Sequence, residues 1–251
     1  MSSQLNKEDI ESELIRSIDW PNSMTFKSFK LWLKLSTESL YSELYQQHDF
    51  SIRNQRIAVK NLQKICEATF LLANEVGFQA MTLRQLSTQT GMSMGGLYAY
   101  IKSKDDLAEL IYTFLNRYCE DKITKLVKAD EAADKTLVIL IHSHLYLSEL
   151  LQPWFYFAFM ETKNLSKEHK GVAINSELTM ESLLLTTITE GLKENLFNIE
   201  DNSSQKTQLV AALIKAMLQD WYLKRWKYRK RKVSVDAYAN QVVEMSLKYL
   251  K

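Results

Sequence analysis

The scarcity of helix-breaking residues constrains this chain more than any other feature of its sequence. Among its 251 residues there are only 6 glycines and 2 prolines. An all-β protein needs turn residues at about every 8–12 positions, so this sequence excludes that class. Hydrophobic residues make up 46% of the chain, which is enough to bury a sizeable core. We therefore predict an all-α fold.

Charge, cysteine content and hydropathy exclude further classes. The chain has 32 basic and 30 acidic residues, and its net charge of +2 is too small to indicate nucleic-acid binding by itself. Cys66 and Cys119 are too few for a disulfide scaffold and lack zinc-ligand spacing, so we expect both to be buried. No signal peptide opens the sequence, and its most apolar stretch, residues 137–151, is too short to span a bilayer. These features predict a cytoplasmic protein with no membrane association.

No motif for catalysis or cofactor binding is found. The sequence lacks a nucleophile elbow, a P-loop and a dinucleotide-binding fingerprint. His142 and His144 are two positions apart near Glu149, whereas metal ligands on one helix face are three or four apart. We therefore expect ordinary core or surface histidines, and we predict no enzyme activity, no cofactor and no metal. An α-helical enzyme stays open as one further class of function, and only a possible aromatic cavity and these histidines favour it.

Four of the six glycines lie between residues 77 and 96, so one short region interrupts an otherwise helical chain. Before this region, apolar residues recur with a period of about 3.6 over residues 55–76. Gly77 follows directly, and glycine is the commonest residue just past a helix end. The pattern predicts one long amphipathic helix that leads into a compact motif.

Within this region the sequence predicts two short helices joined by a turn. Thr82 and Gln85 form a capping box for the first helix, which ends at Gly91. Gly91 supplies the positive φ that the turn requires. Ser93 is expected to cap a second helix over residues 93–100. Two short helices with a glycine-containing turn between them form a helix-turn-helix.

The stretch TLRQLSTQTGMSMGGLYAYIKSKDDLAELI (82–111) resembles the DNA-binding signature of TetR-type transcriptional regulators, which are bacterial repressors. The likeness is densest in residues 91–107, and residues 55–76 with the following GF match the family's first helix. The resemblance implies an all-α protein of three regions: a helical extension at 1–52, a DNA-binding domain at 53–112 with its helix-turn-helix at 82–101, and a helical effector-binding and dimerisation domain at 113–251.

A recognition helix enters the major groove with its first residues against the base edges. Ser93 offers a hydrogen bond there, Met94 a contact for a thymine methyl, and two glycines allow close approach. The resemblance places Tyr98 and Lys104 at phosphates, Thr82 can offer its amide to a phosphate, and the arginines contribute base and minor-groove contacts. The predicted DNA contacts are Arg53, Arg56, Thr82, Arg84, Ser93, Met94, Gly95, Gly96, Tyr98, Tyr100 and Lys104.

Beyond the motif, the sequence predicts helices near residues 104–128, 134–151, 153–163, 173–196, 205–229 and 234–250, the first of them capped by Ser103. Aromatic residues occur all round the 153–163 helix, so we expect it to be central. It forms either simple core or, as the resemblance implies, the wall of a cavity for a small apolar ligand. The candidate ligand-binding residues are Trp154, Phe155, Phe159, Met160, Leu184 and Trp221.

Residues 113–251 also suggest an effector, a dimer interface and a role for a run of basic residues. Residues 160–170 and 188–197 resemble TetR-type members that sense fatty acyl-CoA, which is one candidate effector. The last two helices occupy the place of the family's dimer interface, and a two-fold protein expects a palindromic operator. The apolar positions of these two helices include Leu209, Leu213, Met217, Trp221, Val242, Met245 and Leu250. Between them, KRWKYRKRK (224–232) has seven basic residues in nine. It is a helix C-terminus that favours cations, a site for a phosphate-bearing ligand, or a nucleic-acid contact.

Residues 23–47 read as one amphipathic helix with Ser23 as its cap and aromatic residues at Phe26, Phe29, Trp32, Tyr41 and Tyr45. Exposed, these rings would promote aggregation, so we expect them to pack on the body domain, over a ligand cavity or against a protein partner.

These patterns predict a homodimeric repressor that a small apolar ligand releases from double-stranded DNA. The alternative is a helix-turn-helix regulator controlled by a protein partner on residues 1–52, with no small-molecule effector.

Overall fold

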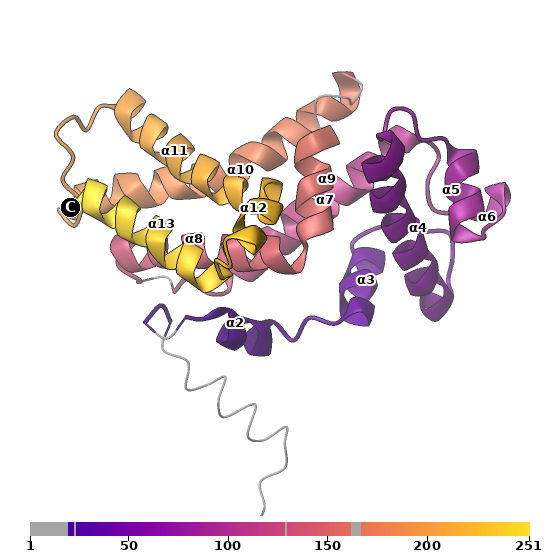
Figure 1. Ribbon diagram of the computed structural model, residues 1–251, viewed down its shortest axis with the longest axis horizontal. Coiled ribbons are helices and arrows are strands. Elements are labelled where there is room, and N and C mark those ends of the chain that lie inside the picture. Colours follow the sequence, from indigo (N-terminus) through magenta and orange to yellow (C-terminus); the bar gives the residue numbers. More distant parts are fainter. Residues whose placement is uncertain (1–19, 23, 129, 162–166) are drawn as a thin grey trace, which may run out of the picture. The chain divides into compact units, whose positions relative to one another are not determined.

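A computed structural model describes residues 20–251 except 23, 129 and 162–166. Every regular element in this part of the chain is a helix (Figure 1), so the predicted all-α fold is confirmed. The helices group into two compact units. Unit 1 comprises Met1–Lys34, Cys119–Leu150 and Thr179–Lys251, and unit 2 comprises Leu35–Tyr118 and Leu151–Leu178. The units do not coincide with the three regions predicted from the sequence. Unit 1 combines parts of the extension and of the effector-binding domain, and unit 2 combines parts of both with the whole DNA-binding domain.

Unit 2 is built around α4 (Gln55–Val76), which packs against α3 (Thr37–Gln46), α5 (Leu83–Thr90) and α9 (Gln152–Glu161). It also holds α6 (Met94–Tyr98) and the first parts of α7 (Lys104–Thr124) and α10 (Lys167–Lys193). The apolar stripe that predicted α4 is the one that the structure buries, and Leu62, Ile65 and Cys66 are fully inaccessible.

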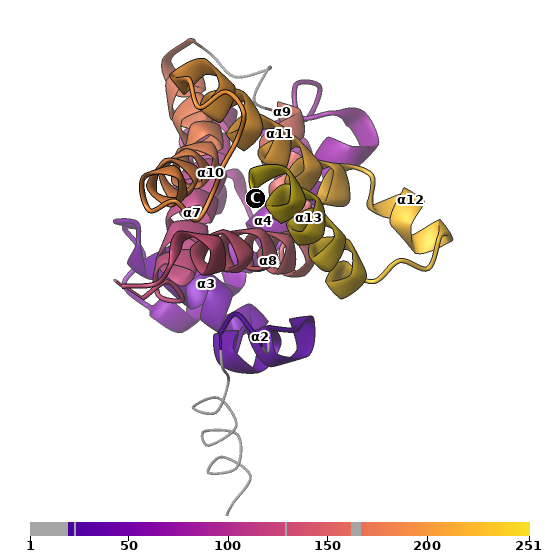
Figure 2. The same ribbon diagram turned by 90° about the vertical axis from the view of Figure 1, so that its left-hand side faces the viewer.

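Unit 1 is built around α8 (Ala133–Leu150), which packs against α2 (Phe26–Leu33), α11 (Ser204–Leu223) and α13 (Val235–Leu250). Figure 2 shows α12 (Arg225–Lys230) at the edge of this group, beside the start of α13. Every side chain from Ile139 to Ser148 is buried, including those of His142 and His144. Both ring nitrogens of His142 lie 3.0 Å from a hydrogen-bond partner. His142 and His144 are therefore core histidines, one of the two environments expected for them.

The single helix predicted over residues 23–47 is wrong, because the structure has two helices there. Thr25 caps α2 and Ser36 caps α3, each through a reciprocal capping box. Between them, Lys34 has φ 49° in the left-handed region, which ends α2. Ser23, the predicted cap, lies outside the described residues. The local hydrogen bonds of the serine and threonine side chains therefore override the continuous apolar pattern.

Several other helix ends differ from the prediction, and the largest difference is at α10, which begins at Lys167 rather than near residue 173 and ends at Lys193 rather than near residue 196. The recognition helix is shorter than residues 93–100, and α7 ends at Thr124 rather than near residue 128. The helix predicted over residues 205–229 is broken at Lys224, which has φ −117° and ψ 33°. At this break Asp220 accepts hydrogen bonds from Lys227 and Tyr228, a tertiary arrangement that a helical period does not reveal.

The aromatic residues of the extension are packed inside each unit, as expected from their hydropathy. In unit 1, the rings of Phe26 and Phe29 lie 5.5 and 5.4 Å from the ring of Tyr146 on α8. In unit 2, the ring of Tyr41 lies 5.9 Å from that of Trp154 on α9. The described part of the extension thus contributes to both cores.

Candidate nucleic-acid interface

The helix-turn-helix begins with a complete capping box. The amide of Gln85 donates to Thr82 Oγ1 at 3.2 Å, and the amide of Thr82 donates to Gln85 Oε1 at 2.8 Å. The predicted cap is therefore confirmed. The same geometry shows that the Thr82 amide, which we expected to meet a phosphate, already has a protein partner.

The turn between α5 and α6 is held by short-range hydrogen bonds. Gly91 has φ 69°, the left-handed conformation for which the sequence selects glycine. Across the turn, the Ser87 hydroxyl donates to the carbonyl of Met92 at 2.5 Å, and Thr90 Oγ1 accepts from the Met92 amide at 3.3 Å. Two polar side chains of α5 thus fix the angle at which α6 begins.

The start of α6 presents a nearly bare backbone. Ser93 caps the helix by accepting the amide of Gly96 at 3.1 Å, and its side chain is exposed. A β-carbon added at Gly95 would meet no atom within 4 Å. Leu97 is fully buried behind this surface. The residues predicted to contact the bases therefore lie on the exposed face of the start of α6. The opposite face of this helix packs against the rest of unit 2 through Leu97.

The two tyrosines of this segment differ in environment. The Tyr98 side chain is 52% exposed. The hydroxyl of Tyr100 accepts a hydrogen bond from Asn61 Nδ2 at 3.0 Å, and its ring lies 5.7 Å from that of Phe50. Tyr98 is therefore placed to reach a partner, whereas Tyr100 links the end of α6 to α4.

Lys104 is also engaged within the protein. Its ammonium group donates to the carbonyls of Phe78 and Gln79 at 3.1 and 2.7 Å, and lies 5.6 Å from the centre of the Phe78 ring. These bonds tie the turn after α4 to the first residue of α7. By contrast, the side chains of Arg53, Arg56 and Arg84 are exposed.

Sequence reasoning missed the residues that hold the motif in place. Asn61 and Phe50 position Tyr100, and the carboxylate of Asp106 accepts the amide of Lys102 at 3.1 Å. Ser103, by contrast, caps α7 as predicted. Asn61 interrupts the apolar stripe of α4, and that polar interruption was the one available signal.

The predicted ligand residues lie in both units. On α9 of unit 2, Trp154 packs against Phe70 and Phe114 at 5.1 and 5.2 Å, while Phe159 is 40% exposed. In unit 1, Leu184 and Trp221 are fully buried. Phe155 is buried and Met160 is half-buried.

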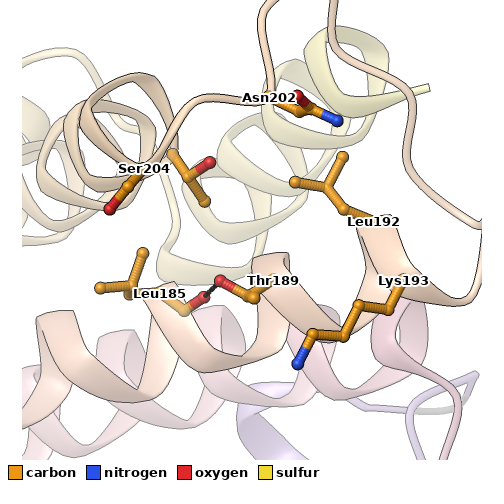
Figure 3. A pocket seen from close by; sticks show the side chains of 7 residues that line it. Leu185, Thr189, Leu192, Lys193, Asn202 and Ser204 are labelled. Atoms are coloured by element: carbon orange, nitrogen blue, oxygen red, sulfur yellow. Dashed lines mark hydrogen bonds between the residues drawn. The ribbon is translucent and has the colours of Figure 1, made fainter.

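A pocket of about 490 Å³ lies elsewhere in unit 1. Figure 3 shows Leu185, Thr189 and Lys193 on α10, with Ser204, the first residue of α11, and Asn202, in the loop before it, on the opposite side of the pocket. None of the predicted ligand residues lines this pocket. Its mixed polar and apolar walls do not match a purely apolar effector.

The last helices expose apolar side chains that differ in part from those expected. Leu209, Leu213 and Met245 are more than half exposed. Trp221, Val242 and Leu250, which we expected among the interface positions, are buried inside the protomer, and Met217 is half-buried. Tyr249, at 50% exposure, joins the exposed set through its spacing of four from Met245.

Other chemistry finds little support in the described part of the chain. No group of three or more His, Cys, Asp or Glu side chains there is arranged to hold a metal ion. Burial, followed by the charge of Glu67, raises the pKa of the Cys66 thiol, which keeps it in the unreactive protonated form. None of the helices described is long and apolar enough to cross a membrane.

Comparison with known proteins agrees with the helix-turn-helix geometry. Residues 65–111 match the family model described as "Bacterial regulatory proteins, tetR family". These residues run from the middle of α4 into α7 and include both motif helices. The chain therefore carries a TetR-family DNA-binding domain, and the resemblance predicted from the sequence is confirmed.

Solved structures extend the likeness of fold beyond this domain. A tetR-family regulatory protein from Rhodococcus RHA1 is 20% identical, with a TM-score of 0.67 over 76% of this chain and 96% of that one. FadR from Bacillus subtilis, in complex with stearoyl-CoA, is 18% identical, with a TM-score of 0.60 over 75% and 98%. AibR, in complex with isovaleryl coenzyme A and operator DNA, is 17% identical, with a TM-score of 0.63 over 74% and 97%. No curated protein matches the sequence.

Proposed function

We propose that this chain is a dimeric transcriptional repressor that binds a palindromic operator through α5 and α6 and leaves it when a small ligand binds. The observation that carries the proposal is the start of α6, where Ser93, Gly95 and the exposed Tyr98 form a thin helical surface backed by the buried Leu97. A helix of this kind fits the major groove, where its first residues reach base edges. No feature of this surface suggests catalysis.

We assign the contacts by their exposure and partners. Ser93, Met94, Gly95 and Gly96 approach the bases, and Arg84 reads them from α5. Arg53 and Arg56 reach a minor groove, while Tyr98 contacts a phosphate. Thr82 caps α5 rather than binding a phosphate, because its amide and its hydroxyl both donate to Gln85 Oε1. Lys104 and Tyr100 position the recognition helix through their hydrogen bonds to Phe78, Gln79 and Asn61.

The dimer is proposed to form through the exposed faces of α11 and α13. Leu209 and Leu213 are one helical turn apart, as are Met245 and Tyr249, and all four are at least half exposed. An isologous interface of two such helices from each protomer would bury this apolar surface. Two reading heads related by a two-fold axis require a palindromic site.

We propose an apolar, acyl-CoA-type effector for the body of the protein. FadR and AibR, whose folds resemble this chain, were solved with acyl-CoA ligands. Titration with palmitoyl-CoA should lower operator affinity, and an unchanged affinity would exclude long-chain acyl-CoA. The alternative, a protein partner on residues 1–52, is favoured by no contact, because the described aromatic residues of the extension are packed within the units.

The decisive experiment is a gel shift with the DNA upstream of the protein's own gene. Gly95→Glu adds a carboxylate where the structure has open space, so we expect normal folding and a loss of affinity of more than about 100-fold. Gly171→Glu is the matched control, because a β-carbon there also meets no atom within 4 Å, and it should bind as the wild type. Equal binding by Gly95→Glu and the wild type would show that α6 does not enter the groove.

A further inference from the structure

The seven cations of the run 224–232 divide into two groups. Lys224 and Lys227 place their ammonium groups 2.6 and 2.7 Å from the carboxylate of Asp220. Arg225 donates two hydrogen bonds to Glu149, at 2.7 and 2.8 Å, in a bidentate pair. Three of the seven cations therefore have a carboxylate partner inside unit 1.

The other four cations are consecutive and have no such partner. The side chains of Arg229, Lys230, Arg231 and Lys232 are all exposed, and none forms an ion pair or hydrogen bond with the described residues. Beside them the indole of Trp226 is 68% exposed, the highest exposure among the large hydrophobic residues described. Trp226 and residues 229–232, which we call the α12 surface, thus combine four free positive charges with an apolar ring.

A segment of the same chain has the complementary composition. Residues 1–19, which lie outside the described residues, contain five acidic and two basic side chains, a net charge of −3. The acidic residues concentrate at positions 8–13. Ile10, Leu14 and Ile18 recur every four positions, the spacing of one helix face. The segment therefore offers both charges for the cations and apolar groups for the indole.

Phe26, a few residues after this segment, contacts the part of unit 1 that directly follows the α12 surface in the chain. The amide of Phe26, the first residue of α2, donates to Asp236 Oδ1 at 2.7 Å. Asp236 is in the first turn of α13, four residues after Lys232. Nineteen residues span up to about 60 Å when extended, and a tether of this length gives effective concentrations of about a millimolar. Reach therefore does not limit the contact.

We propose that residues 1–19 dock in cis on the α12 surface, with their carboxylates on Arg229–Lys232 and their apolar side chains on Trp226. The docked segment shields the four cations from the phosphate backbone of DNA. Without it, these cations would add a non-specific, salt-dependent attraction to any duplex. The acidic segment thus leaves DNA binding to the helix-turn-helix.

Zero-length carbodiimide cross-linking of the full-length protein tests the contact directly, since it joins carboxylates to lysines in contact. Mass spectrometry should find residues 8–13 joined to Lys230 or Lys232, with the yield falling in 0.5 M NaCl. In a mixture of ¹⁵N-labelled and unlabelled protein, the joined peptides should be both heavy or both light. Joined peptides of mixed label, or acidic residues joined only to other lysines, would overturn docking in cis on this surface.

Reversing the charges of the acidic segment is a second test of the docking. Glu8→Lys/Glu11→Lys/Glu13→Lys should abolish these cross-links and raise affinity for non-operator DNA about 10-fold, with a steeper salt dependence. Combining it with Arg229→Glu/Lys230→Glu/Arg231→Glu should restore cross-links of opposite polarity and the low affinity. Lys224→Gln/Lys227→Gln, at the paired positions, should leave both readouts unchanged. Vesicles of phosphatidylserine offer a second anionic surface for the same comparison. If the acidic-segment variant bound neither non-operator DNA nor these vesicles more tightly than the wild type, the segment would not cover the α12 surface and the proposal would be wrong.

Discussion

The two helices of the helix-turn-helix, α5 and α6, and the junction of α8, α11 and α12 are held together in opposite ways. Around α5 and α6, the stabilising hydrogen bonds join Thr82 to Gln85, Ser87 to Met92 and Ser93 to Gly96, pairs three to five residues apart. At the junction, Glu149 accepts hydrogen bonds from Trp221 and Arg225, which lie 72 and 76 positions further along the chain. The caps and the turn of the helix-turn-helix are specified by neighbouring residues, although Asn61 and Lys104 add longer-range contacts, whereas the junction is specified only by the fold.

Mutations in these two regions should therefore affect stability differently. A change in a local cap alters one short helix and leaves the rest of the core in place. A change at the junction removes contacts that several helices share, so its cost falls on the whole of unit 1. We expect mutations at the two regions to differ in the size of the stability loss and in how far it spreads.

Trp221→Ala should have the largest effect. The Trp221 indole is fully buried, stacks on Tyr228 with ring centres 5.0 Å apart, and donates to Glu149 at 3.0 Å. Its truncation leaves a large cavity and should lower the free energy of unfolding by about 3–5 kcal/mol, as measured by urea denaturation. Trp221→Phe, which retains a stacking ring, is the control and should lose less than half as much. A loss below about 1 kcal/mol for Trp221→Ala would show that the junction does not stabilise unit 1.

The same contrast decides how much could be predicted from the sequence. The caps at Thr82 and Ser93, the positive φ of Gly91 and the stripe of α4 depend on residues three or four apart, so the sequence contains them in full. Together they located the helix-turn-helix, and the family followed from the resemblance of residues 82–111 to its DNA-binding signature. The short α6 was overestimated because it ends where Tyr100 turns to Asn61, a contact 39 positions away.

The unpredicted features depend on distant residues. The break at Lys224 and the burial of Trp221 and Leu250 result from packing between α8, α11, α12 and α13. No helical period distinguishes an apolar residue that faces its own core from one that faces a second copy. The exposed and buried members of that set became separable only when the neighbouring helices were in place.

Asp220→Asn tests the junction by charge and should have an intermediate effect. Burial acts to raise the pKa of Asp220, but hydrogen bonds from Lys224, Lys227 and Tyr228 lower it from 3.8 to about 2. Because the pKa is lower in the folded state, the ionised carboxylate stabilises the protein above about pH 4, and this contribution is lost as the pH falls towards 2. Solvent screening limits it to about 1 kcal/mol.

Urea denaturation at a series of pH values measures this effect. The variant should be less stable than the wild type at pH 7, and the difference should shrink between about pH 4 and pH 2. Glu244→Gln, which removes an exposed ion pair with Lys248, is the control and should change stability less. A difference between wild type and Asp220→Asn that stayed constant with pH would mean that the carboxylate charge is not what Asp220 contributes.

Substitutions at Ser93 should have the smallest effect on stability and separate capping from DNA reading. The Ser93 hydroxyl caps a helix of only five residues, so Ser93→Ala should cost about 1 kcal/mol. Aspartate is an equally good cap, and Ser93→Asp should retain wild-type stability. Its negative charge at the groove should nevertheless weaken operator binding at least about 10-fold, because phosphates and base acceptors repel it. If Ser93→Asp bound DNA normally while Ser93→Ala did not, Ser93 would act only as a cap, and the local region would share the purely structural role of the junction.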